Sequence, residues 1–71
     1  MYTWEQAVER CKEISQRHGR GHTIVEDTKY KDQPDRYVVA PTSHKNAPWM
    51  RERAHVHGKT LELTRLDEDP V

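Results

Sequence analysis

The sequence is poor in residues that often define a protein class. Phenylalanine is absent, and the 71 residues include one cysteine, three glycines and four prolines. A single cysteine, Cys11, excludes an intrachain disulfide and a zinc site built from several cysteines. Three glycines are too few for a glycine-rich phosphate-binding loop. We therefore expect no cofactor, and a reducing, cytoplasmic setting is the natural one.

Long apolar runs are also missing. Apolar residues make up 32% of the chain, against about 45–50% in an ordinary globular domain. No run approaches the roughly 20 apolar residues that span a bilayer, and charged residues interrupt the stretch where a secretory signal would lie. Twelve basic residues balance twelve acidic ones. We expect one small domain over residues 1–66, an acidic tail over residues 67–71, and no membrane partner.

The first eighteen residues carry the clearest pattern in the chain. Apolar side chains recur every three or four positions from Trp4 onward, and charged side chains occupy the other positions. Thr3 and Gln6 have the spacing of a capping box, which satisfies unpaired N–H groups at the start of a helix. Gly19 can end the helix. The pattern predicts an amphipathic helix over Thr3–His18.

The rest of the chain is typical of strands, because β-branched and aromatic residues gather between turn-forming clusters. Pro41 indicates an edge strand or the end of a strand. A tight turn is expected at Gly58 and Lys59. A short helix over residues 46–53 is the alternative for the third segment. The expected strands are His22–Lys31, Arg36–Thr42, Met50–Val56 and Thr60–Leu66.

These elements predict an α+β fold, in which the N-terminal amphipathic helix packs on a three- to four-stranded antiparallel sheet. The third strand carries most of the candidate functional residues. Strict alternation would place Met50, Ala54 and Val56 on one face and a basic row, Arg51, Arg53, His55 and His57, on the other. Trp49, beside irregular polar sequence, is expected either to plug the thin core or to anchor a partner. The predicted binding residues are Lys45, Trp49, Arg51, Arg53, His55, His57 and Lys59.

Two histidine pairs raise the alternative of a metal site. His18 and His22 are four apart, and His55 and His57 are two apart, so each pair could supply two ligands to a tetrahedral zinc. The glycines between the first pair end the helix, which removes the regular spacing such a site would use. We predict no metal site, and we expect the His18 side chain to favour the carboxyl end of the helix.

No pattern of a nucleophile, base or paired carboxylates stands out, so an enzyme is not expected. Arg, Tyr and Trp are the residues that most often carry binding energy at interfaces. The sequence favours a small non-enzymatic binding module, acting stoichiometrically as an inhibitor or adaptor of a protein or nucleoprotein complex. Compact chains of this kind are common in phages and other mobile elements, which makes such an origin an expectation.

Direct nucleic-acid binding through the basic row is the alternative function. Five lysines and arginines face two glutamates between Pro41 and Arg65, and Trp49 or Tyr37 could stack on bases. The zero net charge argues against it, because nucleic-acid-binding proteins usually carry a basic surplus. Open strand edges also allow a homodimer.

Overall fold

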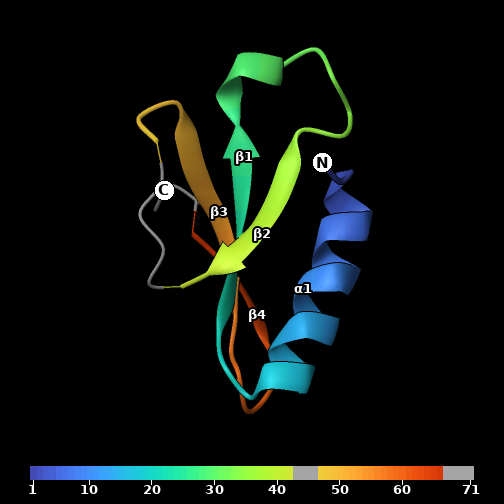
Figure 1. Ribbon diagram of the computed structural model, residues 1–71, viewed down its shortest axis with the longest axis vertical. Coiled ribbons are helices and arrows are strands. Elements are labelled where there is room, and N and C mark those ends of the chain that lie inside the picture. The colour runs from blue at the N-terminus through green and yellow to red at the C-terminus, as the bar shows by residue number, and fades with distance from the viewer. Residues whose placement is uncertain (43–46, 67–71) are drawn as a thin grey trace.

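One helix and a four-stranded antiparallel sheet make up the fold, as the sequence pattern predicts (Figure 1). The computed structural model describes residues 1–42 and 47–66. The predicted acidic tail and Lys45 lie outside the described residues. The elements are helix α1 (Trp4–His18), strand β1 (His22–Asp27), 3₁₀ helix η1 (Thr28–Tyr30), and strands β2 (Tyr37–Pro41), β3 (Met50–Val56) and β4 (Leu63–Arg65).

Helix α1 begins and ends where its sequence predicts. The Thr3 hydroxyl accepts from the Gln6 N–H, and the Gln6 side chain accepts from the Thr3 N–H, so the capping box is present. Gly19 ends the helix in the left-handed region at φ 63°, a conformation that glycine adopts without a Cβ penalty. No helix among the described residues is long and apolar enough to cross a membrane.

The strands follow the order β2-β1-β3-β4, with every neighbouring pair antiparallel. Strand β1 is therefore central, and β2 and β4 form the two edges. Pro41 is the last residue of edge strand β2, which confirms both expectations for this proline. Figure 1 shows α1 running beside one face of this sheet.

The core lies between α1 and that face of the sheet, which we call the helix face. Ala7 and Cys11 from the helix pack against Ile24, Ala54 and Val56 from the central strands, and all five are fully buried. At one end of the core, the rings of Trp4 and Tyr37 meet edge to face, 5.4 Å between centroids. Burial of these few side chains supplies most of the hydrophobic stabilisation of a thin domain.

Two expectations about element lengths were wrong. Strand β1 ends at Asp27, because the Asp27 side chain accepts from the Lys29 N–H and starts η1 instead of continuing the strand to Lys31. The β3–β4 turn is longer than two residues: it closes with the His57 N–H on the Glu62 carbonyl. The strand expected over Met50–Val56 is present with these bounds, and the alternative of a short helix through Arg53 is wrong because residues 50–53 belong to β3.

A β-bulge overturns the predicted basic row on β3. Ile24 pairs with Ala54, but the next residue of β1, Val25, pairs with Glu52, so Arg53 is an extra residue on β3. A one-residue slip moves the following side chains to the opposite face of a sheet. Arg53 reaches Glu26 beside the core, whereas His55 contacts Thr42 on the other face. The four basic residues therefore do not form one row.

Candidate functional site

All three glycines of the chain gather at one end of the molecule, where the α1–β1 turn meets the β3–β4 turn (lower end of Figure 1). A Cβ on Gly58 would lie 2.6 Å from the Arg20 carbonyl carbon and 2.8 Å from the Gly21 nitrogen. The two turns therefore pack backbone against backbone, which only glycine allows at this distance. This contact constrains the backbone from which the side chains of both turns project.

Those side chains are mostly basic, and we call this region the histidine end. It is defined by His18, Arg20, His22, His55, His57 and Lys59, which line two adjoining clefts. The linings of the two clefts share Gly21 and Thr42, so the clefts adjoin at the start of β1.

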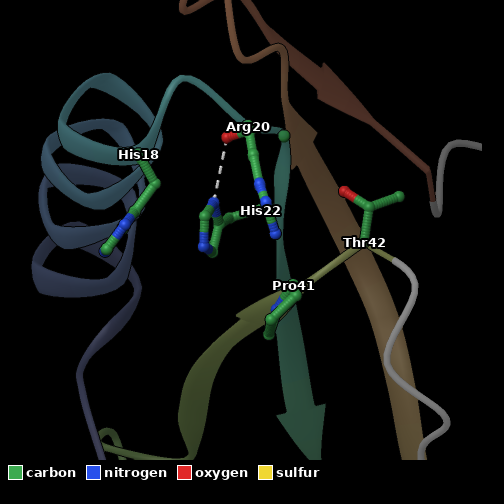
Figure 2. A pocket seen from close by; sticks show the side chains of 6 residues that line it. His18, Arg20, His22, Pro41 and Thr42 are labelled. Atoms are coloured by element: carbon green, nitrogen blue, oxygen red, sulfur yellow. Dashed lines mark hydrogen bonds between the residues drawn. The ribbon is translucent and has the colours of Figure 1, made fainter.

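The larger cleft, about 650 Å³, lies between the carboxyl end of α1, the start of β1 and the end of β2. Figure 2 shows His18, Arg20 and His22 around it. His22 is 7% exposed, and its Nδ1 lies 3.0 Å from the Arg20 carbonyl oxygen and 3.2 Å from Ser15 Oγ. A carbonyl oxygen only accepts, so Nδ1 is the donor. The other ring nitrogen, Nε2, makes no hydrogen bond with a described residue.

The smaller cleft, about 340 Å³, is formed by the β3–β4 turn. His57 Nδ1 accepts from the backbone N–H groups of Lys59 at 3.2 Å and Thr60 at 3.4 Å. Because Nδ1 accepts, the neutral ring carries its proton on Nε2 and offers it as a donor. His55 Nδ1 lies 3.1 Å from Thr42 Oγ1. The ring also lies against Gly21, since a Cβ there would be 2.7 Å from His55 Cε1.

Charge is one-sided at the histidine end. The residues that line the two clefts include four histidines, one arginine and one lysine, and no carboxylate among the described residues. Glu62 in the neighbouring turn is exposed and lines neither cleft. The carboxyl end of α1 favours positive charge on His18 and Arg17 in its last turn. This arrangement can hold an anion by charge and by N–H donors.

A metal centre has a weaker basis here. The rings of His18 and His22 lie 6.1 Å apart between centroids. Within the described ranges 1–42 and 47–66, no group of three or more histidine, cysteine or acidic side chains is placed to hold a metal ion.

The structure brings together three of the residues named from the sequence, His55, His57 and Lys59. It adds His18, Arg20 and His22, which were not among the predicted binding residues. Their signal in the sequence is the run His-Gly-Arg-Gly-His over residues 18–22. Two histidines around a glycine-flanked arginine indicate a turn that presents basic side chains. Whether these residues bind a partner stays a prediction.

Trp49 lies away from this cluster, beside η1. Its carbonyl accepts from the N–H of Thr28 at 3.0 Å, and Lys29 Nζ lies 3.6 Å from the centroid of its ring. The Trp49 side chain is 42% exposed, so it does not plug the core. Arg51 is also exposed.

Arg53 lies in a third place, in an ion cluster on Glu26. Both carboxylate oxygens are used: Oε1 lies 2.7 Å from an Arg53 guanidinium nitrogen, and Oε2 accepts from Arg36 Nε. Burial by itself would raise the pKa of Glu26, but hydrogen bonds and charge from the two arginines outweigh burial and lower it. Arg53 therefore has a clear structural role in closing one end of the core.

No family model, curated protein or solved structure matches this chain.

Proposed function

We propose that the protein is a small, non-enzymatic binding module that acts stoichiometrically, as an inhibitor or adaptor, by docking its histidine end on an acidic surface of a partner protein. The observation that carries the proposal is the lining of the two clefts, with six basic or histidine side chains and no described carboxylate. Complementary charge steers association and selects partners. Preorganised glycine turns reduce the ordering that binding requires.

The nucleophile candidates support a binding role over catalysis. Burial raises the pKa of the Cys11 thiol to about 11, and hydrogen bonds from Ser15 and the Val56 backbone oppose this only in part. A protonated, buried thiol is a poor nucleophile. Ser15 is also fully buried. A free buried cysteine fits the reducing cytoplasm that we propose as the setting.

Strand addition is a less favourable way for this fold to bind a second chain. On the outer side of β2, Tyr37 already exchanges two backbone hydrogen bonds with Tyr2, and Pro41 has no N–H to offer. Because backbone groups alternate in direction along a strand, Val39 is the residue of β2 left to pair through both groups. Strand β4 has three residues. A homodimer formed through either edge strand would therefore have few backbone N–H and C=O groups to pair.

Nucleic-acid binding remains the second candidate, because the same cations would attract phosphates. The bulge on β3 argues against the basic row through which the sequence suggested nucleic-acid binding. Arg53 is held by Glu26, and Trp49 lies beside η1 and not beside the histidines. A stacking aromatic and a continuous basic row are thus not combined on one surface.

Capture of partners with the full chain as bait tests the proposal. The bait is compared with an Arg20→Gln/Lys59→Gln variant and with Lys12→Gln, whose exposed lysine lies on α1 outside the two clefts. We expect a defined protein to be retained by the parent chain and by Lys12→Gln, with and without nuclease, and lost from the double variant. Binding by the double variant equal to that of the parent would overturn the proposal. Loss of all capture on nuclease treatment would favour the second candidate.

A further inference from the structure

The larger cleft has the chemistry of a site for one compact, doubly charged anion. We propose that this cleft binds a terminal phosphate group, a phosphomonoester, through Arg20, His18 and His22. The inference rests on the proposed function for the choice of the histidine end, and it goes further by naming the chemical group that the end recognises. The group can come from a phosphorylated side chain of a partner protein or from free phosphate, which carry the same oxygens.

Arg20 is the residue best placed to attract such a group. Most of the other arginines face carboxylates: Arg10 and Arg17 pair with Glu13, and Arg36 and Arg53 pair with Glu26. Arg20 makes no ion pair within the described part of the chain, and it lines the cleft. A guanidinium presents a planar fork of donors that matches two phosphate oxygens.

His22 supplies the buried part of the site. Its side chain is more than nine-tenths buried, yet it lines the cleft. Nδ1 is held by the Arg20 carbonyl, so the ring orientation is fixed and Nε2 is the nitrogen left for a ligand (Figure 2). When the ring is protonated, Nε2–H becomes a charged donor. His18, with its ring 6.1 Å away between centroids, can donate from the helix side.

The turn that carries Arg20 is held in place before any ligand arrives. Gly58 approaches the Arg20 backbone so closely that a Cβ on Gly58 would lie 2.8 Å from the Arg20 Cα. A fixed backbone lowers the ordering that accompanies binding. The site is also concave, which suits the end of a chain or side chain better than a phosphodiester inside a continuous nucleic-acid backbone.

Proton balance gives the proposal a distinctive signature. A phosphomonoester takes its second negative charge near pH 6. A dianion gains more from the Arg20 charge than a monoanion does, so affinity should rise as the phosphate loses its second proton. The nearest other charged groups and histidines are Arg17 in the last turn of α1, which pairs with Glu13, and His55, His57 and Lys59, which line the adjoining cleft. The dipole of α1 opposes an anion by about half a charge, less than Arg20 alone provides.

Nuclear magnetic resonance titration of the full chain tests the site. The probes are inorganic phosphate, O-phosphoserine and an oligonucleotide without terminal phosphates, with sodium chloride at matched ionic strength as the control. We expect phosphate and phosphoserine to shift the imidazole signals of His18 and His22 along saturable curves, with tighter binding above pH 6, where the phosphate is a dianion, than below it. Arg20→Gln should weaken the phosphate affinity about tenfold, as for a lost charge-assisted hydrogen bond.

The controls separate the phosphate site from a general basic surface. Arg20→Lys should recover part of the affinity, and Lys12→Gln should leave it unchanged. Because Arg20 and His18 are exposed, their variants should also keep the parent melting temperature. Equal shifts with chloride, tighter binding of the oligonucleotide, or an unchanged affinity in Arg20→Gln would each overturn the phosphate site. If the phosphate site fails these tests, partner capture that depends on Arg20 and Lys59 would still support the proposed docking function. If phosphate binds but no partner is captured, the phosphate site would stand and the proposed docking function would be contradicted.

Discussion

The two ends of the sheet use the same kinds of side chain for opposite purposes. At the end near η1, cations are covered or neutralised: Lys29 lies on the Trp49 ring, and Arg36 and Arg53 share the carboxylate of Glu26. At the histidine end, Arg20 and Lys59 line clefts with no described carboxylate beside them. Charge therefore contributes to folding at the first end, and at the second end we propose that it serves recognition.

Removal of the Glu26 charge should give the largest loss of stability. Glu26 accepts charge-assisted hydrogen bonds from two arginines in a partly buried cluster, so Glu26→Gln should lower the free energy of unfolding by about 3 kcal/mol. Chemical denaturation measures the change. The matched control is Glu9→Gln on the exposed side of α1, which should stay within about 0.5 kcal/mol of the parent. Equal losses of stability in both variants would contradict a structural role for the charge on Glu26.

Acid should destabilise the fold through the same Glu26 cluster. The pKa of Glu26 is lowered in the folded protein by Arg36 and Arg53 against the opposing effect of burial. A lowered folded-state pKa means that the ionised group stabilises the fold above its unfolded pKa, and that this contribution is lost as pH falls through the folded value. Stability measured from neutral to acidic pH should therefore decline, and Glu26→Gln should show a smaller decline. Parallel curves for the two proteins would contradict this assignment.

Alanine at two glycines should distinguish crowding from backbone strain at the histidine end. Gly58→Ala places a Cβ 2.6 Å from backbone atoms of Arg20, and such overpacking should destabilise the fold by about 2 kcal/mol. Gly19→Ala meets nothing within 4 Å but keeps φ 63°, which costs about 1 kcal/mol. Thermal unfolding of both variants checks the order. The reverse order would show that the two turns are not held together as described.

The smallest effects on stability should come from exposed side chains. Lys59→Gln at the histidine end and Trp49→Ala beside η1 should each change the free energy of unfolding by no more than about 0.5–1 kcal/mol. Their effects on partner capture should differ, with a loss for Lys59→Gln and little change for Trp49→Ala. Capture that depends on Trp49 instead would move the recognition surface to the other end of the sheet.

Much of the fold follows from the sequence because its signals are local. The capping residues Thr3 and Gln6, the apolar stripe on α1 and the position of Pro41 each depend on short-range patterns, and each has the predicted outcome. The antiparallel sheet follows from short connections between strand-like segments. Local physics of this kind is the most dependable part of a sequence-based prediction.

The remainder depends on contacts between distant segments. The bulge arises where β3 meets β1, and nothing in the sequence of β3 alone marks Arg53 as the extra residue. Leu61 adopts φ 60° although it is not glycine, because its side chain packs against the core from the turn. His55, His57 and Lys59 of the histidine end were named from the sequence, and their binding role stays a prediction. The tight approach of Gly58 to Arg20, which brings the other half of the site alongside, is a tertiary contact.

The strand order also bears on how the chain assembles. Strands β1 and β2 form one hairpin, β3 and β4 form another, and the pairing of β1 with β3 joins them along a single seam. Partners across that seam, such as His22 and Val56, are far apart in sequence, and non-local pairing slows folding. We therefore expect each hairpin to form before the two dock, and the docking to be the slower step. A chain interrupted between β2 and β3 would keep both hairpins whole, which makes this protein suited to fragment complementation, with recovery of the clefts as the sign that the halves have rejoined.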